Sequence, residues 1–474
     1  MKVSTPSVRA PLTMSLSTAT LPVLGLGVFS FLIPASPSVD PVAPANQVCG
    51  RRLYLRHCSP CHGDFGLGDG PGAETLDPKP RDFSRERFRL VSTVDGIPTQ
   101  EDLIEVISRG IVGSAMPPHD HFSQDELAAV ANFILVLTMN RRAEIFQELA
   151  AEEGEELEWE EAIAKVPLEP GPPVSLPPAH APTLDLLAEG EAYFQQNCAS
   201  CHDADGRGRL RTDLLDEQDR PVLARDFQAG IFKGGSRPVD IFRRIRCGMP
   251  GTPMPAYELS PREAWGLVHF VESLIDPRAQ EQARQRHQLF RPETVQEPLD
   301  AHPNAEIWNS VSTQWIALAP LQWTETRVPG FELQLAQDDT TLGLRLSWSD
   351  STPGLAAEGA TPDSLTVRFS QEPTPQFFCP GREDETSEYW EWDANSGDFD
   401  YEPLGVSVRS IHENGKYEVV ILRKLEASPD RVGVGTEPVS IGFEIRNGAG
   451  GDPDRSQNLT VWHKLAAHPA GDAR

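Results

Sequence analysis

The chain is poor in cysteine and in basic residues, and both shortages limit what it can be. Only seven of its 474 residues are cysteines, and four of these fall in two C-x-x-C-H motifs. The remaining Cys49, Cys247 and Cys379 are scattered, so there is no disulfide framework. Lys and Arg number 42 against 70 Asp and Glu, which gives a formal charge of -28. This charge argues against nucleic acid as a ligand and favours a basic or charge-complementary partner.

The N-terminal apolar run is too short to cross a bilayer. It extends from Leu21 to Ile33, and Lys2 and Arg9 precede it. A transmembrane helix needs about 20 apolar residues, whereas a basic segment, a short apolar run and then small residues are typical of a secretory signal. We predict a signal peptide over residues 1–38 and a periplasmic or otherwise exported protein of the bacterial cell envelope. An uncleaved membrane anchor is the alternative.

The sequence repeats itself with a period of about 140 residues. A glycine precedes the first motif cysteine by eight residues in both copies, as Gly50 before Cys58 and Gly190 before Cys198. Ser-x-x-Glu, which forms a capping box at the start of a helix, recurs later in each copy. The matching segments are Arg81-Asp82-Phe83 with Arg225-Asp226-Phe227, the Gly-x-x-Met-Pro loops 113–117 with 251–255, and the capping boxes 123–126 with 260–263.

The character of the sequence changes between and after the copies. Glu-rich sequence from Glu148 to Glu161 and Pro-rich sequence from Pro167 to Pro182 predict a linker that tethers two domains. Beyond residue 297, alternating runs separated by turn signals predict strands. We therefore expect a multidomain fold, with two all-α domains and a C-terminal all-β sandwich. The expected boundaries are 1–38 (signal), 45–145 (first domain), 146–184 (linker), 185–278 (second domain), 279–296 (connector) and 297–466 (sandwich).

The two C-x-x-C-H motifs are haem-attachment signatures. Two thiols at this spacing can bond both vinyl groups of one porphyrin, and the adjacent histidine then reaches the iron. A reduced thiol pair or half of a zinc site is the alternative, but neither copy supplies a second pair of ligands. We expect two covalently attached c haems and two iron-ligating histidines. The predicted residues are Cys58, Cys61 and His62 in the first copy and Cys198, Cys201 and His202 in the second.

Methionine is the expected second iron ligand in each copy. Met116 lies 54 residues after His62, and Met254 lies 52 residues after His202, in matching Gly-x-x-Met-Pro loops. With histidine and methionine bound, each iron would be six-coordinate, which suits electron transfer rather than chemistry at a vacant iron position.

The other candidate ligands fit less well. Met249 aligns with the apolar Ile111, which cannot bind iron, and Met139 belongs to the closing apolar helix, where core packing explains it. Cys247 aligns with the charged Arg109, so we expect an inert thiol near the surface.

On these motifs, over about residues 45–145 and 185–278, the chain resembles the class I cytochrome c family. The resemblance implies helical domains whose first and last helices cross closely. It leaves open which acceptor orients each ligating histidine. The residues implied at the helix contacts are Gly50 with Tyr54 and Gly190 with Phe194. The candidates to neutralise haem propionates are Arg81, Arg89, Arg225 and Lys233, with ordinary surface residues as the alternative.

The region after residue 300 resembles the haem-binding gamma subunit of ethylbenzene dehydrogenase and related molybdenum oxidoreductases. The matching segments are 304–308, 344–350, Phe377-Phe378-Cys379-Pro380-Gly381 and Trp390-Glu391-Trp392. In that family the sandwich holds a non-covalent b-type haem between a methionine and a lysine. Here Pro380 stands at the methionine position, and only Lys416, Lys424 and Lys464 could supply the lysine.

A b-type haem in this third domain is therefore doubtful. We expect the domain to have kept the sandwich, lost the haem and become a docking module. The alternative is a substitute iron ligand such as Cys379, His412 or His463.

Together these patterns predict a periplasmic di-haem c-type cytochrome without catalytic residues. Its expected partners are redox proteins, including a respiratory oxidoreductase of the molybdenum type of which it could be a subunit. A di-haem peroxidase or other haem enzyme is the alternative, and the methionine loops of both copies argue against it.

Overall fold

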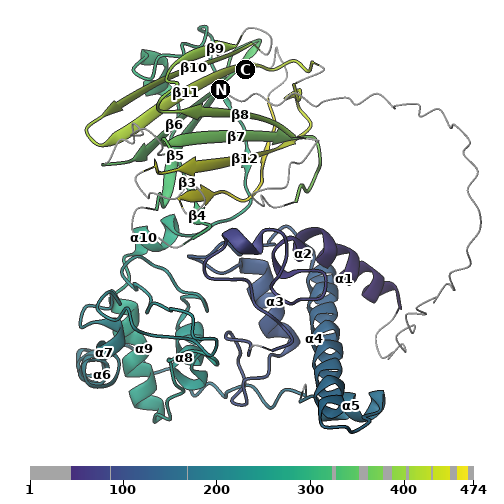
Figure 1. The fold of residues 1–474 in the computed structure, drawn as a ribbon. Coiled ribbons are helices and arrows are strands. Elements are labelled where there is room, and N and C mark those ends of the chain that lie inside the picture. Colours follow the sequence, from purple (N-terminus) through teal and green to yellow (C-terminus); the bar gives the residue numbers. More distant parts are fainter. Residues whose placement is uncertain are drawn as a thin grey trace, which may run out of the picture.

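The structure is a computed structural model that describes residues 44–467 except 86, 168, 323–326, 352–360, 377–386, 402–404, 429–430 and 449–455. Two helical bodies lie beside each other, and a body of strands lies against them (Figure 1). The predicted signal peptide and the Phe377–Gly381 turn lie outside the described residues. Among the helices that are described, none is both long and apolar enough to cross a membrane.

The first helical body is built on two helices that cross, α1 and α4. Leu103 and Ile107 on α3 and Leu127 and Val130 on α4 share one core with Tyr54 on α1. The predicted capping box opens α4. The elements are α1 (Pro44–His57), α2 (Ser59–His62), η1 (Ala73–Thr75), α3 (Gln100–Arg109) and α4 (Gln124–Glu152), so the last helix ends beyond the expected boundary at 145.

The second helical body repeats this plan. Phe194 on α6 packs in one core with Ile241 on α8 and Leu267 on α9, and a second predicted capping box opens α9. The elements are α6 (Leu184–Asn197), α7 (Ala199–His202), α8 (Pro238–Cys247) and α9 (Pro261–Ser273).

Part of the predicted linker between the two copies packs on the first helical body. Within the linker, helix α5 (Trp159–Lys165) buries Ala162 against Ala143 of α4. Farther along, the Val174 amide donates to the Ser92 carbonyl at 2.7 Å. The Glu-rich stretch contains enough apolar residues to bury one helix face, so it packs rather than remaining fully solvated.

The C-terminal body contains two sheets in the described part of the chain. One has the order β1-β14-β12-β13-β4, with β7 paired to β12 and to β8, and the other has the order β2-β5-β6-β11-β10-β9, with β3 paired to β5. The strands are β1 (Leu289–Phe290), β2 (Glu293–Thr294), β3 (Gln314–Ala317), β4 (Ala319–Pro320), β5 (Gly330–Gln337), β6 (Thr341–Ser349), β7 (Ser364–Ser370), β8 (Ser387–Asp393), β9 (Phe399–Tyr401), β10 (Val406–Glu413), β11 (Lys416–Lys424), β12 (Val439–Arg446), β13 (Gln457–Leu459) and β14 (His463–Leu465). Helix α10 (Pro277–Gln282) and the turn η2 (Glu306–Ser310) precede most of them.

Residues of both sheets belong to one apolar core. The rings of Phe331 on β5 and Phe443 on β12 lie 5.1 Å apart, and Trp390 and Trp392 on β8 are buried in the same core. The region predicted to be rich in strands is therefore confirmed as such, and its pattern of alternating apolar residues explains why.

The strand body also packs directly on the first helical body. Leu76 and Ala115 form an apolar cluster with Leu321, Leu459 and Trp462. This cluster places the strand body beside the loop that carries Met116.

Candidate haem sites

In both copies the C-x-x-C-H motif forms one short turn at the end of a longer helix. The Cys58 amide donates to the Tyr54 carbonyl at 2.8 Å, and the His62 amide donates to the Cys58 carbonyl at 2.9 Å. The corresponding bonds of Cys198 and His202 have the same two lengths. The structure therefore gathers two thiols and one imidazole into each turn, which is the donor set that covalent haem attachment requires.

Each attachment turn is held by a close helix crossing. A Cβ on Gly50 would lie 2.2 Å from the Ala129 carbonyl oxygen, and one on Gly190 would lie 2.0 Å from that of Gly266. Real Cβ atoms do not approach backbone this closely, so glycine is required at both crossings. The predicted aromatic contacts accompany them, with ring centroids 5.2 Å apart for Tyr54 and Phe133 and 5.1 Å apart for Phe194 and Phe270.

The two histidines that are predicted to ligate iron lie against residues of the repeated Arg-Asp-Phe triplet. Nδ1 of His62 lies 3.2 Å from the Arg81 carbonyl oxygen. If Nδ1–H donates to this oxygen, Nε2 keeps the lone pair that iron needs. Burial lowers the pKa of His62 to about 4, while the Arg81 backbone bond opposes the shift. The imidazole is therefore neutral at pH 7, which is its ligand form.

The second copy repeats this arrangement with looser geometry. Burial lowers the pKa of His202, and the Arg225 backbone opposes the shift in the same way. Its Nδ1 nevertheless has no hydrogen bond of good geometry to any described residue. The Arg225 carbonyl is the counterpart of the Arg81 carbonyl and is the equivalent candidate acceptor for this ring.

A phenylalanine ring stacks on each ligating imidazole. The centroids lie 4.8 Å apart for His62 and Phe83 and 4.7 Å apart for His202 and Phe227, with interplanar angles of 21° in both pairs. A second ring continues each stack, at 5.7 Å for Phe88 on Phe83 and 5.2 Å for Phe232 on Phe227. The plane of each imidazole is thus set from one side by apolar packing.

The two methionine loops have one backbone conformation. The Ile111 amide donates to the Met116 carbonyl at 3.1 Å, and the Met249 amide donates to the Met254 carbonyl at the same distance. Met249 thus takes the backbone position of Ile111, as the alignment of the copies predicts. Met116 and Met254 remain the predicted iron ligands.

Two remaining side chains differ in their surroundings. Cys247, expected near the surface, is only 8% exposed at the end of α8, so this expectation is wrong. Burial raises the pKa of its thiol, which keeps it protonated and unreactive. Met139 lies half-buried within α4. Cysteines of the described residues form no disulfide.

Positively charged side chains gather where the helical bodies meet. We call Arg81, Arg89, Arg225, Lys233 and Arg327 the interface cluster. Burial, followed by the positive charges of Arg225, Arg89 and Arg81, lowers the pKa of Lys233 well below its usual value. Burial, with the charges of Arg327 and Arg89, lowers the pKa of Arg225 to about 10. All four candidates for propionate contact therefore influence one another across the two copies.

Two carboxylates partly balance the interface cluster. Asp216 accepts a hydrogen bond from Arg89 at 2.6 Å, and both side chains are almost completely buried. Glu217 lies 3.8 Å from Arg81 and also pairs with Arg87 at 2.9 Å. Asp226 acts on Arg327 in the same sense. Haem propionates are anions that a cluster of arginines and lysine can bind.

Sequence reasoning missed the structural part played by the Arg-Asp-Phe triplet. The recurrence of the triplet at matching positions is visible in the sequence. It led to a prediction for the charged side chain of each arginine and to none for its backbone carbonyl. The stacking phenylalanine could have been found from the same recurrence. Carbonyl direction, in contrast, depends on the folded loop.

Comparisons with known proteins agree with the motifs. Residues 45–134 match the family model described as cytochrome C oxidase, cbb3-type, subunit III, and residues 187–274 match the one described as cytochrome c. Among solved structures, the chain is similar to one from the Kuenenia stuttgartiensis reducing HAO-like protein complex, at 31% identity over 48% of this chain and 96% of that one, with a TM-score of 0.40. It is also similar, at 12% identity, to a carbohydrate binding module family 9 protein from Caldicellulosiruptor kristjanssonii, over 40% of this chain and 99% of that one, with a TM-score of 0.28.

Both TM-scores are below 0.5, so nothing about the activity of this chain follows from those structures. The family matches cover the same two segments that carry the C-x-x-C-H motifs and methionine loops. Cytochrome c domains carry a covalently attached haem, and the iron of this haem supplies the redox chemistry. The chain therefore contains cytochrome c domains and transfers electrons.

Proposed function

We propose that the chain is an exported di-haem cytochrome that relays electrons between its two c haems and a partner protein. In this proposal His62 and Met116 ligate one iron, and His202 and Met254 ligate the other. The chain acts as an electron carrier, and the third domain, a β-sandwich, is the docking module.

The interface cluster carries this proposal. Its propionate candidates come from both copies and lie within electrostatic reach of one another, and Arg89 is bonded directly to Asp216 of the other copy. If each haem turns its propionates towards this cluster, the two haem edges approach each other across the domain interface. Electrons could then pass between the haems without leaving the chain.

A larger assembly is the second part of the proposal. The resemblance of the C-terminal region to the gamma subunit of ethylbenzene dehydrogenase favours a molybdenum-type respiratory oxidoreductase as partner. The strong negative charge of the chain favours a basic docking surface on that partner. Co-purification of the native protein, followed by identification of bound subunits, tests this part separately.

A di-haem peroxidase is the competing function. Peroxide cleavage needs a vacant iron position, whereas matching methionine loops occur in both copies. Negligible peroxidase turnover in the fully oxidised protein is expected. Substantial turnover without prior reduction would favour the enzyme instead.

Haem counting and a charge variant test the relay. Mass spectrometry of protein from a host with haem-attachment machinery should show two covalent haems per chain. Arg225→Gln should lower the reduction potentials of both haems, because the pKa of Arg225 stays at about 10 and the variant therefore removes a positive charge that stabilises the reduced form at neutral pH. Lys165→Gln, which removes one exposed positive charge on α5, is the control and should leave both potentials unchanged. A shift of only one potential would contradict the shared cluster.

A further inference from the structure

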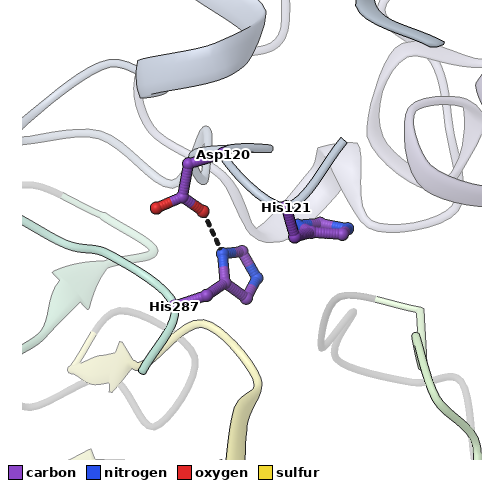
Figure 2. Close-up of side chains that lie close together, drawn as sticks. All are labelled: Asp120, His121 and His287. Atoms are coloured by element: carbon purple, nitrogen blue, oxygen red, sulfur yellow. Dashed lines mark hydrogen bonds and ion pairs between the residues drawn. The ribbon is translucent and has the colours of Figure 1, made fainter. Parts of the chain in front are cut away.

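A second group of metal-binding side chains lies outside the haem sites. Figure 2 shows Asp120, His121 and His287, with the Asp120 carboxylate and the His287 imidazole joined by a hydrogen bond. One ligand atom from each of the three residues lies within 4.8 Å of the other two. The His121 and His287 rings lie 4.3 Å apart between centroids.

The fold brings these residues together from distant parts of the chain. Asp120 and His121 follow the Met116 loop and precede the helix cap at Ser123. His287 belongs to the connector between α10 and β1. The group therefore joins the methionine loop of the first helical body to the segment that enters the strand body.

A buried histidine beside this group has no partner of its own. His463 on β14 is 2% exposed, and neither ring nitrogen has a hydrogen bond to any residue that the structure describes. It lies next to the connector, since the Lys464 amide donates to the Gln288 carbonyl at 2.7 Å. The charges of His287 and Asp120 act on its ring. A buried imidazole without a partner calls for an ordered water or another polar group in its own pocket, and His463 is not one of the three residues whose ligand atoms lie together.

We propose that Asp120, His121 and His287 bind one divalent transition-metal ion of the Zn²⁺ class. Two imidazoles and one carboxylate are ligands that zinc and its neighbours prefer, whereas Ca²⁺ and Mg²⁺ prefer all-oxygen sites. A tetrahedral Zn²⁺ holds its ligand atoms about 3.3 Å apart, so the widest gap in the group must close by at most about 1.5 Å, and the hydrogen bond between Asp120 and His287 must give way to the ion. Asp120 and His121 are exposed, which leaves a path for the ion to enter.

The bound ion would act as a clamp between two bodies of the protein. With three protein ligands, the fourth position is left for water. Fixing His287 to Asp120 and His121 would hold the connector against the end of the Met116 loop.

Zinc titration of the untagged, full-length holoprotein tests the site. After chelator treatment, isothermal calorimetry should show one Zn²⁺ per chain, and elemental analysis should count zinc separately from haem iron. His121→Ala and Asp120→Asn should each weaken binding more than about 100-fold, since even loss of a residue behind a metal ligand costs 10- to 100-fold. Unchanged haem absorption and circular dichroism in each variant would show that the fold is retained.

A third variant distinguishes zinc binding at the proposed site from nonspecific zinc binding by surface histidines. His180→Ala changes an exposed histidine whose described contact is made by its backbone carbonyl. It should bind zinc as wild type does. The proposal is overturned if wild type binds no stoichiometric zinc, if the His121 and Asp120 variants keep wild-type affinity, or if His180→Ala loses affinity as they do.

Discussion

The buried ion pair between Arg89 and Asp216 gives the sharpest test of how the two haem domains are joined. Its N–O distance is 2.6 Å, and the side chains are 10% and 3% exposed. Asp216 also accepts from the backbone amides of Gln218 at 2.9 Å and Arg220 at 3.0 Å. Asp216→Asn keeps the size of the side chain, removes its charge and turns an amide donor towards an arginine.

The cost should be large because little water reaches the pair. Removal of one partner from a buried ion pair destabilises a protein by about 3–5 kcal/mol. If haem propionates lie near the interface cluster, as we propose, they can take over part of the role of the lost carboxylate, so we expect the lower end of this range, about 3 kcal/mol. At 1.4 kcal/mol for each factor of ten, local opening of the interface should become about 100-fold more frequent.

Hydrogen exchange read by mass spectrometry measures this opening locally, which matters because a multidomain chain does not unfold in one step. Peptides covering 81–91 and 214–222 should lose protection in Asp216→Asn. Glu189→Gln is the matched control, since it breaks an ion pair with Arg262 whose side chains are 50% and 53% exposed. Equal protection of the two segments in the two variants would refute the reasoning.

Three further predictions concern ligation, packing and pH. Met254→Ala should lower the reduction potential of one haem, abolish its methionine-to-iron charge-transfer band and let the iron bind exogenous ligands. Met249→Ala should do none of these. If Met254→Ala keeps the band, the iron ligand is Met249 instead. Gly190→Ala should destabilise the α6–α9 crossing by about 2 kcal/mol, because a Cβ 2.0 Å from the Gly266 carbonyl oxygen puts overpacking at the upper end of its range, about 3 kcal/mol, and helix propensity returns about 1 kcal/mol. Ala188→Gly, on the exposed side of α6, calibrates that gain, and hydrogen exchange of α6 reports both variants. Burial opposes ionisation of Asp216, but hydrogen bonds from the Arg220 and Gln218 amides and from Arg89 outweigh it and hold the pKa of Asp216 below the usual 3.8. The ionised carboxylate therefore stabilises the interface above pH 3.8, and this stabilisation is lost as the pH falls through the lower folded-state pKa. Acid titration followed by hydrogen exchange at 214–222 should show this loss in the wild type and no such loss in Asp216→Asn.

Some features of the chain could be predicted because they depend on short stretches of sequence. The two attachment turns, the capping boxes at Ser123 and Ser260 and the alternating strands of the C-terminal region are local patterns, and each is present in the structure. The repeat allowed further predictions, because each position in one copy could be compared with its counterpart in the other. The resemblance to the class I cytochrome c family correctly placed Gly50 and Gly190 at the helix crossings.

Packing between elements was harder to predict. Charge and proline dominate the composition of the linker, yet a few apolar residues suffice to pack α5 on α4. Cys247 was expected at the surface because its counterpart is arginine, but burial of one side chain depends on what the neighbouring body covers.

The amino-acid sequence by itself determined the chemistry of this protein, because haem attachment needs two thiols and an imidazole within five consecutive residues. Only the tertiary structure decided how the parts are combined. Arg89 meets Asp216, and Asp120 meets His287, across 127 and 167 residues of chain. Charge and composition carry no information about such distances, because these contacts exist only after separate cores have formed and packed together.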